Sequence, residues 1–433
     1  MAITLSHNSK ILTGNIELTS SKSISNRVLM IKALSGLNFE IKNLAEAKDT
    51  QTLLKLLAND STTFDVGHAG TVMRFLTAFL AIKEGVFVLT GSERMQERPI
   101  KILVDALKTL GANITYLKNE GYPPLKIKGK KLIGGSIKID GSVSSQYISA
   151  LMLVAPYLER GLTIHFLGEI TSKPYLEMTA QIMRYFGCPT LTLPEGEGNF
   201  SPFGGDKRGG CWSIKLGKYI AKDFFVEADW SAASYWYSMV ALADKADVKL
   251  YGLQQNSLQG DAVVQKIYEQ FGVNTEFIKN GIRLTKASNF QLPTSNFVLD
   301  FTNCPDIAQT VAVTCAALNV PAKLIGLHTL RIKETDRIVA LQTELTKLNY
   351  NVEVEGDDLI ILPSLRTERH SCESRNLAIK TYDDHRMAMA FAPLGLLYPI
   401  TIEDENVVVK SYPNFWEDLK VVGFDIIQMS GNN

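Results

Sequence analysis

The segment ALKTLGA at residues 106–112 contains a pattern that recurs along the chain and indicates its fold class. Its helical spacing of apolar residues stops at Leu110, and Gly111 follows, a residue type that readily adopts the left-handed conformation closing a helix. Similar segments end at Gly187, Gly272 and Gly423. A weaker copy has Asn349 in the same place, and a fainter sixth spans residues 53–59. The chain therefore contains an internal repeat.

The five clear copies are spaced by 74 to 85 residues. This period is longer than that of solenoid repeats and suits a unit of two helices and several strands. Hairpin patterns follow the helix ends, for example residues 352–354 and 359–362 across the turn 356–358. We therefore expect duplicated α/β units with mixed sheets. No GxGxxG follows a strand and no GxxxxGK[ST] occurs, so Rossmann and P-loop folds lack their main support.

Length and charge narrow the class of protein. The 433 residues are 45% hydrophobic and 21% charged, which predicts a globular chain of two domains. Lys plus Arg equals Asp plus Glu at 45 each, so no overall field attracts nucleic acid or an anionic membrane. The N-terminus lacks a signal-peptide pattern, and the apolar runs around 148–158 and 387–400 are shorter than the ~20 residues that span a bilayer. We expect a cytoplasmic protein.

The cysteines are scattered and odd in number, with no CxxC and no His at ligand spacing. We expect them to be reduced and mostly buried, and we expect no metal site. They are Cys188, Cys211, Cys304, Cys315 and Cys372.

Several predicted helix starts carry groups that bind anions. Residues 20–30 place Lys22 and Arg27 where a helix presents its unpaired N–H groups. Residues 91–100 place Arg94 and Arg98 near Pro99, another probable helix start, and guanidinium groups suit phosphate and carboxylate. The alternative for each segment alone is an ordinary capped surface helix.

Other starts offer uncharged donors or a close backbone approach. Gly70 opens an apolar helix, and its missing Cβ would let a ligand reach the backbone. Residues 141–150 and 172–175 bring hydroxyl and amide groups to helix starts, where they can bind phosphate oxygens.

The C-terminal half adds a mixed cluster of charges. Written as a helix, residues 331–337 place Lys333 and Arg337 on one face with Glu334 beside them, although a solvated helix face is the simpler reading of this segment alone. Asp306 opens an apolar helix, which ordinarily means an N-cap, yet a carboxylate among cations can also act as a general base. Residues 382–392 form a further helix start, and Lys410 follows a strand-like run at 407–409.

Eight motifs in one order give the chain a family resemblance. SKSISNR, HAGTVMR, RMQERPI, SSQYISALMLVAP, SKPYLEMT, DIAQTVA, RIKETDRI and DHRMAMAFA together resemble the 5-enolpyruvylshikimate-3-phosphate synthases, from Lys22 to Lys410. The resemblance implies an α/β fold of two similar domains, each of three βαββαβ units, the inside-out α/β barrel of the enolpyruvyl transferases. It implies domains at residues 1–20 with 229–433 and at 21–228, with hinges near 20–21 and 227–229.

The resemblance also implies substrates and site residues. Shikimate 3-phosphate is expected at Lys22, Ser23, Arg27, Ser144, Ser145, Gln146, Ser172, Tyr175, Asp306 and Lys333. Phosphoenolpyruvate is expected at Lys22, Gly70, Arg98, Gln146, Arg337, Arg386 and Lys410. Supporting roles are expected for His68, Arg74, Arg94 and His385.

The reaction implied is the transfer of an enolpyruvyl group to the 5-hydroxyl of shikimate 3-phosphate by addition and elimination. Asp306 is expected to take the hydroxyl proton, Glu334 to deliver and remove the methyl proton, and Lys22 to stabilise the departing phosphate. No metal or organic cofactor is implied, and we expect a monomer.

Three positions depart from the family pattern. His68 stands where the family usually has Asn, Thr329 where it has Asn, and Phe75 where Pro is frequent. The first two affect single hydrogen bonds, and Phe75 affects the helix that begins near Gly70 and so the space that inhibitors such as glyphosate would share.

Two other functions remain open from the residues. A related transferase acting on UDP-N-acetylglucosamine uses a loop cysteine, but no Cys precedes Gly111 here. A non-catalytic sensor of phosphorylated metabolites would be expected to lack Asp306 or Glu334, and both are present.

Overall fold

The computed structural model describes residues 1–188, 191–192, 211–292, 297–363 and 378–429, and Cys372 lies outside them. Contacts between Cα atoms divide the chain into two units. Unit 1 comprises Met1–Ser21, Glu46–Lys48 and Glu227–Asn433, and unit 2 comprises Lys22–Ala45 and Asp49–Val226. The chain thus enters unit 2 after Ser21 and leaves it after Val226, and within this stretch only residues 46–48 belong to unit 1.

Unit 2 contains two four-stranded sheets and one pair of short strands among its described residues. The first sheet has the order β4 (Thr63–Asp65), β5 (Gly85–Thr90), β7 (Leu125–Gly129) and β6 (Asn113–Tyr116). The second has the order β8 (Gly135–Asp140), β9 (Leu162–Leu167), β11 (Cys211–Ile214) and β10 (Leu191–Thr192). The pair is β3 (Ile41–Lys42) with β12 (Phe224–Phe225).

The described part of unit 1 contains three four-stranded sheets. The first runs β2 (Ile11–Glu17), β13 (Lys245–Tyr251), β15 (Gly281–Lys286) and β14 (Val273–Ile278). The second runs β16 (Phe297–Asp300), β17 (Ala322–Ile325), β19 (Asp358–Leu362) and β18 (Asn351–Glu355). The third runs β20 (Ala378–Ile379), β21 (Ile400–Ile402), β1 (Ala2–Ser6) and β22 (Asp425–Met429).

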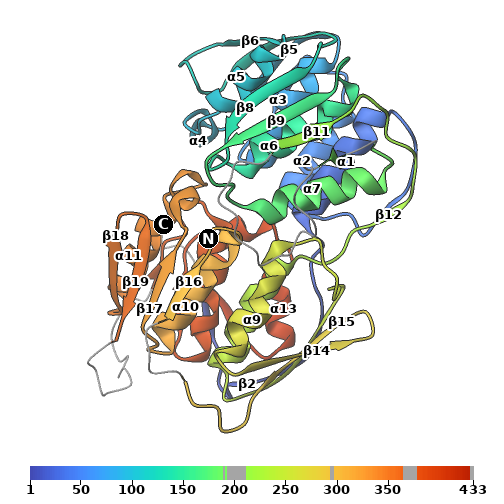
Figure 1. Cartoon of the computed structure of the whole chain (residues 1–433). Coiled ribbons are helices and arrows are strands. Elements are labelled where there is room, and N and C mark those ends of the chain that lie inside the picture. Colours follow the sequence, from blue (N-terminus) through green and yellow to red (C-terminus); the bar gives the residue numbers. More distant parts are fainter. Residues whose placement is uncertain (189–190, 193–210, 293–296, 364–377, 430–433) are drawn as a thin grey trace. The chain divides into compact units, whose positions relative to one another are not determined.

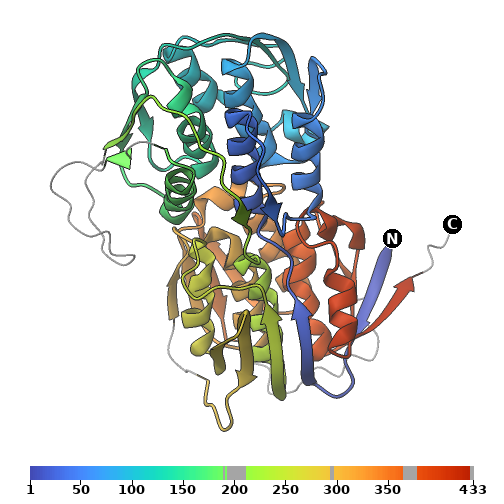
Figure 2. The ribbon, with the colours of Figure 1, turned by 90° about the vertical axis from the view of Figure 1, so that its right-hand side faces the viewer.

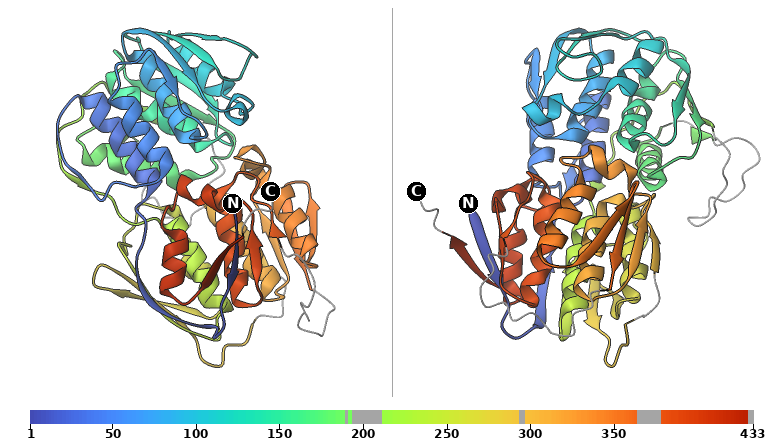
Figure 3. Two further views of the ribbon diagram at one scale, coloured as in Figure 1. Left: turned by 180° about the vertical axis from the view of Figure 1, so that it is seen from behind. Right: turned by 90° about the vertical axis from the view of Figure 1, so that its left-hand side faces the viewer.

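Each four-stranded sheet repeats one pairing scheme: a parallel pair, then an antiparallel partner, then the other strand of a hairpin. In the third sheet of unit 1 that hairpin is interrupted by the chain ends, because β1 and β22 lie side by side (Figure 3). In the first sheet, β2 pairs in parallel with β13 from more than half the chain away (Figure 2). The repeat predicted from sequence is therefore present, and two of its copies are assembled from distant segments.

The helices of unit 2 lie between and beside these sheets (Figure 1). They are α1 (Lys22–Ser35), α2 (Lys48–Leu57), α3 (Gly70–Ile82), α4 (Glu93–Gln96), α5 (Lys101–Thr109), α6 (Ser145–Val154), η1 (Ala155–Tyr157) and α7 (Lys173–Tyr185). Helices α3 and α6 are apolar, almost fully buried and packed together. They form the inner layer of the unit, since an all-round apolar helix must be covered on every side.

Unit 1 has the same layering. Its helices are α8 (Trp230–Leu242), η2 (Gly260–Val263), α9 (Val264–Glu269), η3 (Pro305–Ile307), α10 (Ala308–Ala317), η4 (His328–Ile332), α11 (Arg337–Lys347), α12 (His385–Phe391), η5 (Ala392–Leu396), η6 (Glu405–Lys410) and α13 (Phe415–Val421). All residues of α8 and α12 are buried, and α10 packs against both. No helix in the described ranges is both long and apolar enough to cross a membrane.

The repeated helix ends have the geometry predicted from sequence. Gly111, Gly187, Gly272, Asn349 and Gly423 all have positive φ. At four of these ends, the amide of the following residue donates to the carbonyl five residues earlier, as Ala112 does to Leu107. This bonding satisfies carbonyl groups that a helix end otherwise leaves without partners.

We predict that Gly111→Ala lowers the free energy of unfolding by about 1 kcal/mol, because a Cβ is strained at this φ of +99°. No atom lies within 4 Å of the position that the Cβ would take, so crowding adds nothing. Gly111→Asn is the matched control and should cost less, since Asn occupies the equivalent place at Asn349. Urea unfolding curves measure both. Equal losses for the two variants would contradict the explanation.

Candidate active site

Asp306 is the centre of a charged cluster in unit 1. It lies in η3, and its carboxylate is 2.9 Å from Arg386 Nη2, 3.5 Å from Arg337 Nη1 and 3.6 Å from Lys333 Nζ. The N-cap residues of η3 and α10 are Cys304 and Ile307, so the N-cap interpretation of Asp306 is wrong. The side chain instead faces three cations from two separate segments, Lys333 and Arg337 from residues 331–337 and Arg386 from α12.

The protonation of Asp306 is set by two opposing effects. Burial alone would raise the pKa of its carboxyl group, but the charges of Arg386, Lys333 and Arg337 together hold that pKa well below its usual range. Burial lowers the pKa of Lys333, and Asp306 partly offsets this effect. Asp306 is therefore ionised at neutral pH and available to accept a proton.

Arg337 is 1% exposed and held by carboxylates on several sides. Its Nε donates to Asp384 Oδ2 at 2.7 Å, and its Nη2 donates to Glu334 Oε2 at 2.8 Å and to Asp384 Oδ1 at 3.3 Å. Although burial acts to lower the pKa of Arg337, Asp384 and Glu334 raise it overall. Glu334, Arg337 and Asp306 thus form one continuous network of charges.

Asp384 had no role in the sequence analysis, yet it orients both arginines of this network. It is fully buried and is the N-cap of α12, where its Oδ1 accepts from the amide of Arg386 at 2.8 Å. The same carboxylate binds Arg337, 47 residues away. An acidic residue directly before a helix start was the available signal, but its long-range partner cannot be read from spacing.

Two local expectations for this cluster are wrong. Lys333 and Arg337 do not share a helix face, because η4 ends at Ile332, Lys333 is extended and α11 begins only at Arg337, capped by Asp336. They meet at Asp306 through the turn between the helices. Lys410 does not follow a strand: residues 405–410 form the 3₁₀ helix η6.

Lys410 and His385 complete the unit 1 group. Lys410 is 9% exposed, and its Nζ donates to the carbonyl of Asp383 at 2.6 Å and also contacts that residue's carboxylate. His385 is 2% exposed, and its Nδ1 lies 4.0 Å from Asp384 Oδ1. Residues 383–386 are thus connected to the charged cluster by ion pairs and hydrogen bonds.

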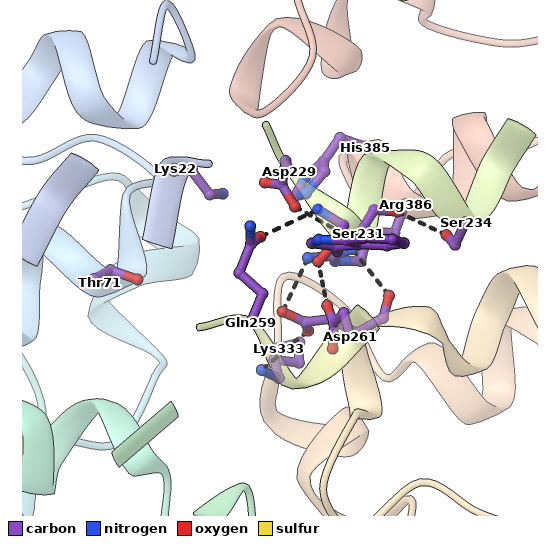
Figure 4. A network of polar contacts seen from close by, with 12 residues as sticks. Lys22, Thr71, Asp229, Ser231, Ser234, Gln259, Asp261, Lys333, His385 and Arg386 are labelled. Carbon is purple, nitrogen blue, oxygen red and sulfur yellow. Dashed lines mark hydrogen bonds and ion pairs between the residues drawn. The ribbon is translucent and has the colours of Figure 1, made fainter. Parts of the chain in front are cut away.

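A further buried acid, Asp261, lies near Arg386 (Figure 4). Ser231, in the first turn of α8, donates a hydrogen bond to Asp261. Burial, reinforced by the charge of Asp306, raises the pKa of Asp261 to about 7. Neither Ser231 nor Asp261 was identified as a site residue from the sequence, because nothing in the local pattern around Asp261 suggests an ionisable group beneath the cluster.

Unit 2 presents its own group at the start of α1. Lys22 Nζ is 3.1 Å from Asp49 Oδ2, and Ser23 follows it in the first turn. Arg27 is 2% exposed and donates to Thr179 Oγ1 at 2.7 Å and to Ser149 Oγ at 3.2 Å. Burial lowers the pKa of Arg27 to about 10.

Gly70 and Arg98 are in direct contact. A Cβ on Gly70 would lie 2.7 Å from Arg98 Nη1 and 2.9 Å from Nη2, so the missing side chain makes room for a guanidinium group. Arg98 is 6% exposed. The sequence predicted a close approach at Gly70, and the structure shows that a protein side chain makes one.

The two other arginines of this region point elsewhere. Arg74 is 4% exposed, and its Nη1 donates to the Gly70 carbonyl at 3.1 Å. Arg94 is half-buried and pairs with Glu97 at 3.1 Å along α4. Arg74 therefore acts on the protein's own backbone, and Arg94 lies in a local ion pair.

The hydroxyl-bearing helix starts also lie in unit 2. Ser144 is the N-cap of α6 and accepts from the Gln146 amide, while Ser145 is buried in the first turn. Gln146 Nε2 donates to Thr71 Oγ1 at 3.0 Å, which links α6 to α3. Ser172 precedes α7 in the left-handed conformation with a φ of 53°, and its side chain makes no capping bond.

The residues that depart from the family pattern occupy different surroundings. Phe75 is 1% exposed, and its ring centroid is 5.7 Å from the Arg27 guanidinium carbon. His68 is exposed, with its Nδ1 3.3 Å from Ser92 Oγ. Thr329 is buried, and its hydroxyl makes no hydrogen bond to any described residue.

The predicted site residues thus fall into two groups. Unit 1 brings together Asp306, Lys333, Glu334, Arg337, His385, Arg386 and Lys410. Unit 2 holds Lys22, Ser23, Arg27, His68, Gly70, Arg74, Arg94, Arg98, Ser144, Ser145, Gln146, Ser172 and Tyr175.

Within the part of the chain that the structure describes, His, Cys, Asp and Glu form no group of three or more that could hold a metal ion. The unit 1 group contains carboxylates that can exchange protons, and both groups contain cations that can bind anions.

Comparison with known proteins identifies the relatives of this chain. A family model described as EPSP synthase (3-phosphoshikimate 1-carboxyvinyltransferase) matches residues 7–62 and 56–419. A 3-phosphoshikimate 1-carboxyvinyltransferase of Bacteroides fragilis is 45% identical over 416 residues, covering 96% of each chain. One from a Sulfurovum species is 37% identical, covering 95% of this chain and 97% of that protein.

Solved structures show the same fold. An EPSP synthase from Acinetobacter baumannii aligns with a TM-score of 0.72 at 21% identity, covering 99% of this chain and all of that one. The family model spans most of the sequence, and the eight motifs lie inside it. The chain belongs to the EPSP synthase (3-phosphoshikimate 1-carboxyvinyltransferase) family.

Proposed function

We propose that the charged cluster around Asp306, together with the cations and hydroxyls of unit 2, carries out the family reaction in this chain. The chain transfers the enolpyruvyl group of phosphoenolpyruvate to the 5-hydroxyl of shikimate 3-phosphate, a step of the shikimate pathway to aromatic amino acids. The observation that supports this assignment of residues is the meeting of Asp306 with Arg386, Arg337 and Lys333. We also propose that the chain acts as a cytoplasmic monomer.

The reaction needs three proton transfers and the departure of phosphate: the hydroxyl loses a proton, the methylene carbon gains one, and the resulting methyl group later loses one. The 5-hydroxyl oxygen bonds to C2 of phosphoenolpyruvate while the methylene carbon gains a proton, and the resulting tetrahedral intermediate then loses phosphate and one methyl proton. We assign the hydroxyl proton to Asp306 and the methyl proton to Glu334. Both carboxylates contact Arg337, so one guanidinium group fixes their relative places.

Substrate binding would also change the pKa of the Asp306 carboxyl group. A carboxylate with a depressed pKa is ionised but weakly basic. Anionic substrates would compete with Asp306 for Lys333 and Arg386, which weakens the attraction that depresses its pKa. The pKa of Asp306 should therefore rise on binding, and its carboxylate should become a stronger base when the hydroxyl arrives.

The remaining residues suit recognition of anions. In this proposal Lys22, Ser23, Arg27, Ser144, Ser145, Gln146, Ser172, Tyr175 and Lys333 bind shikimate 3-phosphate. Lys22, Gly70, Arg98, Gln146, Arg337, Arg386 and Lys410 bind phosphoenolpyruvate. Lys22 and the arginines would stabilise charge on the departing phosphate, where preorganised cations are most effective.

The first prediction concerns substrates. The purified chain should release inorganic phosphate only when shikimate 3-phosphate and phosphoenolpyruvate are both present. A colorimetric phosphate assay measures this, with each substrate alone as the control. Replacing shikimate 3-phosphate by UDP-N-acetylglucosamine should give no phosphate. Release with the nucleotide sugar, or none with the expected pair, would refute the assignment.

The second prediction separates catalysis from binding. Asp306→Asn and Glu334→Gln should each lower turnover about a hundredfold or more, with much smaller changes in substrate affinity, because each removes a proton acceptor and keeps the side-chain shape. Steady-state kinetics and calorimetry measure the two quantities. Asp357→Asn is the matched control, since Asp357 pairs with Arg331 on the surface of the same unit. Unchanged turnover in either variant would remove that residue's role.

The third prediction concerns the two groups acting on the same substrates. If both units bind one substrate pair, shikimate 3-phosphate together with an unreactive competitor of phosphoenolpyruvate should reduce the radius of gyration. Small-angle scattering measures the radius, and shikimate without its phosphate is the control. An unchanged radius with saturating ligands would argue against a joint site.

A further inference from the structure

The carbonyl group of Pro99 is held from two helices in the interior of unit 2. Tyr147, in the first turn of α6, donates its hydroxyl to this oxygen. Arg74, on α3, donates from Nη2 to the same oxygen at 3.3 Å. Proline has no N–H, so the carbonyl is its only backbone hydrogen-bonding group. These two bonds fix the Pro99–Ile100 peptide, and so hold Pro99, the residue that directly follows Arg98.

The two donors are themselves in contact and buried. Tyr147 is 3% and Arg74 is 4% exposed, and the Arg74 guanidinium carbon lies 5.8 Å from the centroid of the Tyr147 ring. Arg74 also donates from Nη1 to the Gly70 carbonyl at 3.1 Å. The interaction therefore joins Gly70 on one side to Pro99 on the other.

Arg98 has little freedom in this arrangement. Its guanidinium group lies so close to Gly70 that a Cβ there would be 2.7 Å from Nη1. A small displacement of Pro99 would shift the neighbouring backbone of Arg98 and move its guanidinium group against α3 or away from it. The adjacent residue Gln146 bonds to Thr71 at 3.0 Å, so the start of α6 holds both the α3 start and the Arg98 segment.

We propose that Tyr147 is a positioning residue, whose hydroxyl fixes the Pro99 carbonyl and thereby the place from which Arg98 binds phosphoenolpyruvate. This inference rests on the proposed function, because it needs Arg98 to contact that substrate. Tyr147 itself touches no reacting atom. A purely structural role for its hydroxyl would affect both substrates alike or only stability, whereas positioning of Arg98 affects phosphoenolpyruvate selectively.

The test variant is Tyr147→Phe, which removes one hydroxyl and keeps the ring beside Arg74. We expect the KM for phosphoenolpyruvate to rise about fivefold to tenfold, since a misplaced charged donor weakens binding of an anion. The KM for shikimate 3-phosphate should stay within about twofold. Arg74→Lys is the second variant, and it should shift the same KM in the same direction because a lysine lacks the forked donors that join Gly70 to Pro99.

Tyr219→Phe is the matched control. Tyr219 is 2% exposed, and its hydroxyl donates to the carbonyl of Leu153 at 2.8 Å on the same helix α6. It removes an equivalent buried bond without a link to Arg98, so both KM values should remain unchanged. Thermal unfolding of all three variants reports any general loss of stability.

Three results would overturn the inference. They are an unchanged KM for phosphoenolpyruvate in Tyr147→Phe, an equal rise of both KM values in that variant, and the same rise in Tyr219→Phe. Failure of the proposed function looks different, because the unmodified protein would then release no phosphate from the two substrates.

Discussion

The contact of Asp306 with Arg386, Arg337 and Lys333 is the interaction on which the site depends. A protein that binds two anions must hold several cations close together before either arrives. Such cations repel one another and lose hydration on burial, so uncompensated they would destabilise the fold. Asp306, Glu334 and Asp384 supply the compensation. Two of these carboxylates, Asp306 and Glu334, are also the groups that we propose as proton acceptors.

The two units solve the problem of holding a buried cation differently. In unit 1, Arg337 is surrounded by carboxylates, and its pKa is raised. In unit 2, Arg27 is surrounded by hydroxyls and carbonyls and lies near the ring of Phe75, so burial lowers its pKa to about 10. An anion reaching Arg27 meets no competing carboxylate among its hydrogen-bond partners, whereas an anion reaching Arg337 competes with Asp384 and Glu334. In the proposed function, an anion bound at Arg27 would therefore displace no carboxylate, whereas an anion bound at the unit 1 cluster would change the ion pairs of its carboxylates.

The sequence predicted what depends on neighbouring residues. Gly111 and Asn349 mark helix ends because a positive φ is a local preference, and the start of α3 at Gly70 followed from local pattern too. The prediction from sequence was wrong where tertiary contacts determine the backbone conformation. Lys333 lies in an extended turn and Lys410 at the end of a 3₁₀ helix, although both segments had plausible regular patterns.

Contacts between residues distant in sequence were the second kind of feature that could not be predicted from the sequence. Asp384 binds Arg337, which is 47 residues away, and Asp261 accepts a hydrogen bond from Ser231, 30 residues away. Neither contact can be predicted from the spacing of residues in the sequence. The family motifs identified candidate site residues that hydrophobic periodicity could not identify, because the motifs reflect contacts between residues distant in sequence. They did not reveal the role of Arg74, whose charge is used on the backbone at Gly70 and Pro99.

The exchange of segments between repeats explains one further polar contact in unit 1. Because β2 pairs with β13 while the chain passes through unit 2 in between, both connections to unit 2 must start at the same edge of unit 1. Gln259 joins them: its Oε1 accepts from Ser21 Oγ at 3.0 Å, and its Nε2 donates to Glu227 Oε1 at 3.0 Å. One buried amide thus bonds to the last residue before the first connection and to the first residue after the second. The unit 1 ends of the two connections consequently cannot shift independently without breaking buried hydrogen bonds, which a polar group removed from water does not readily give up.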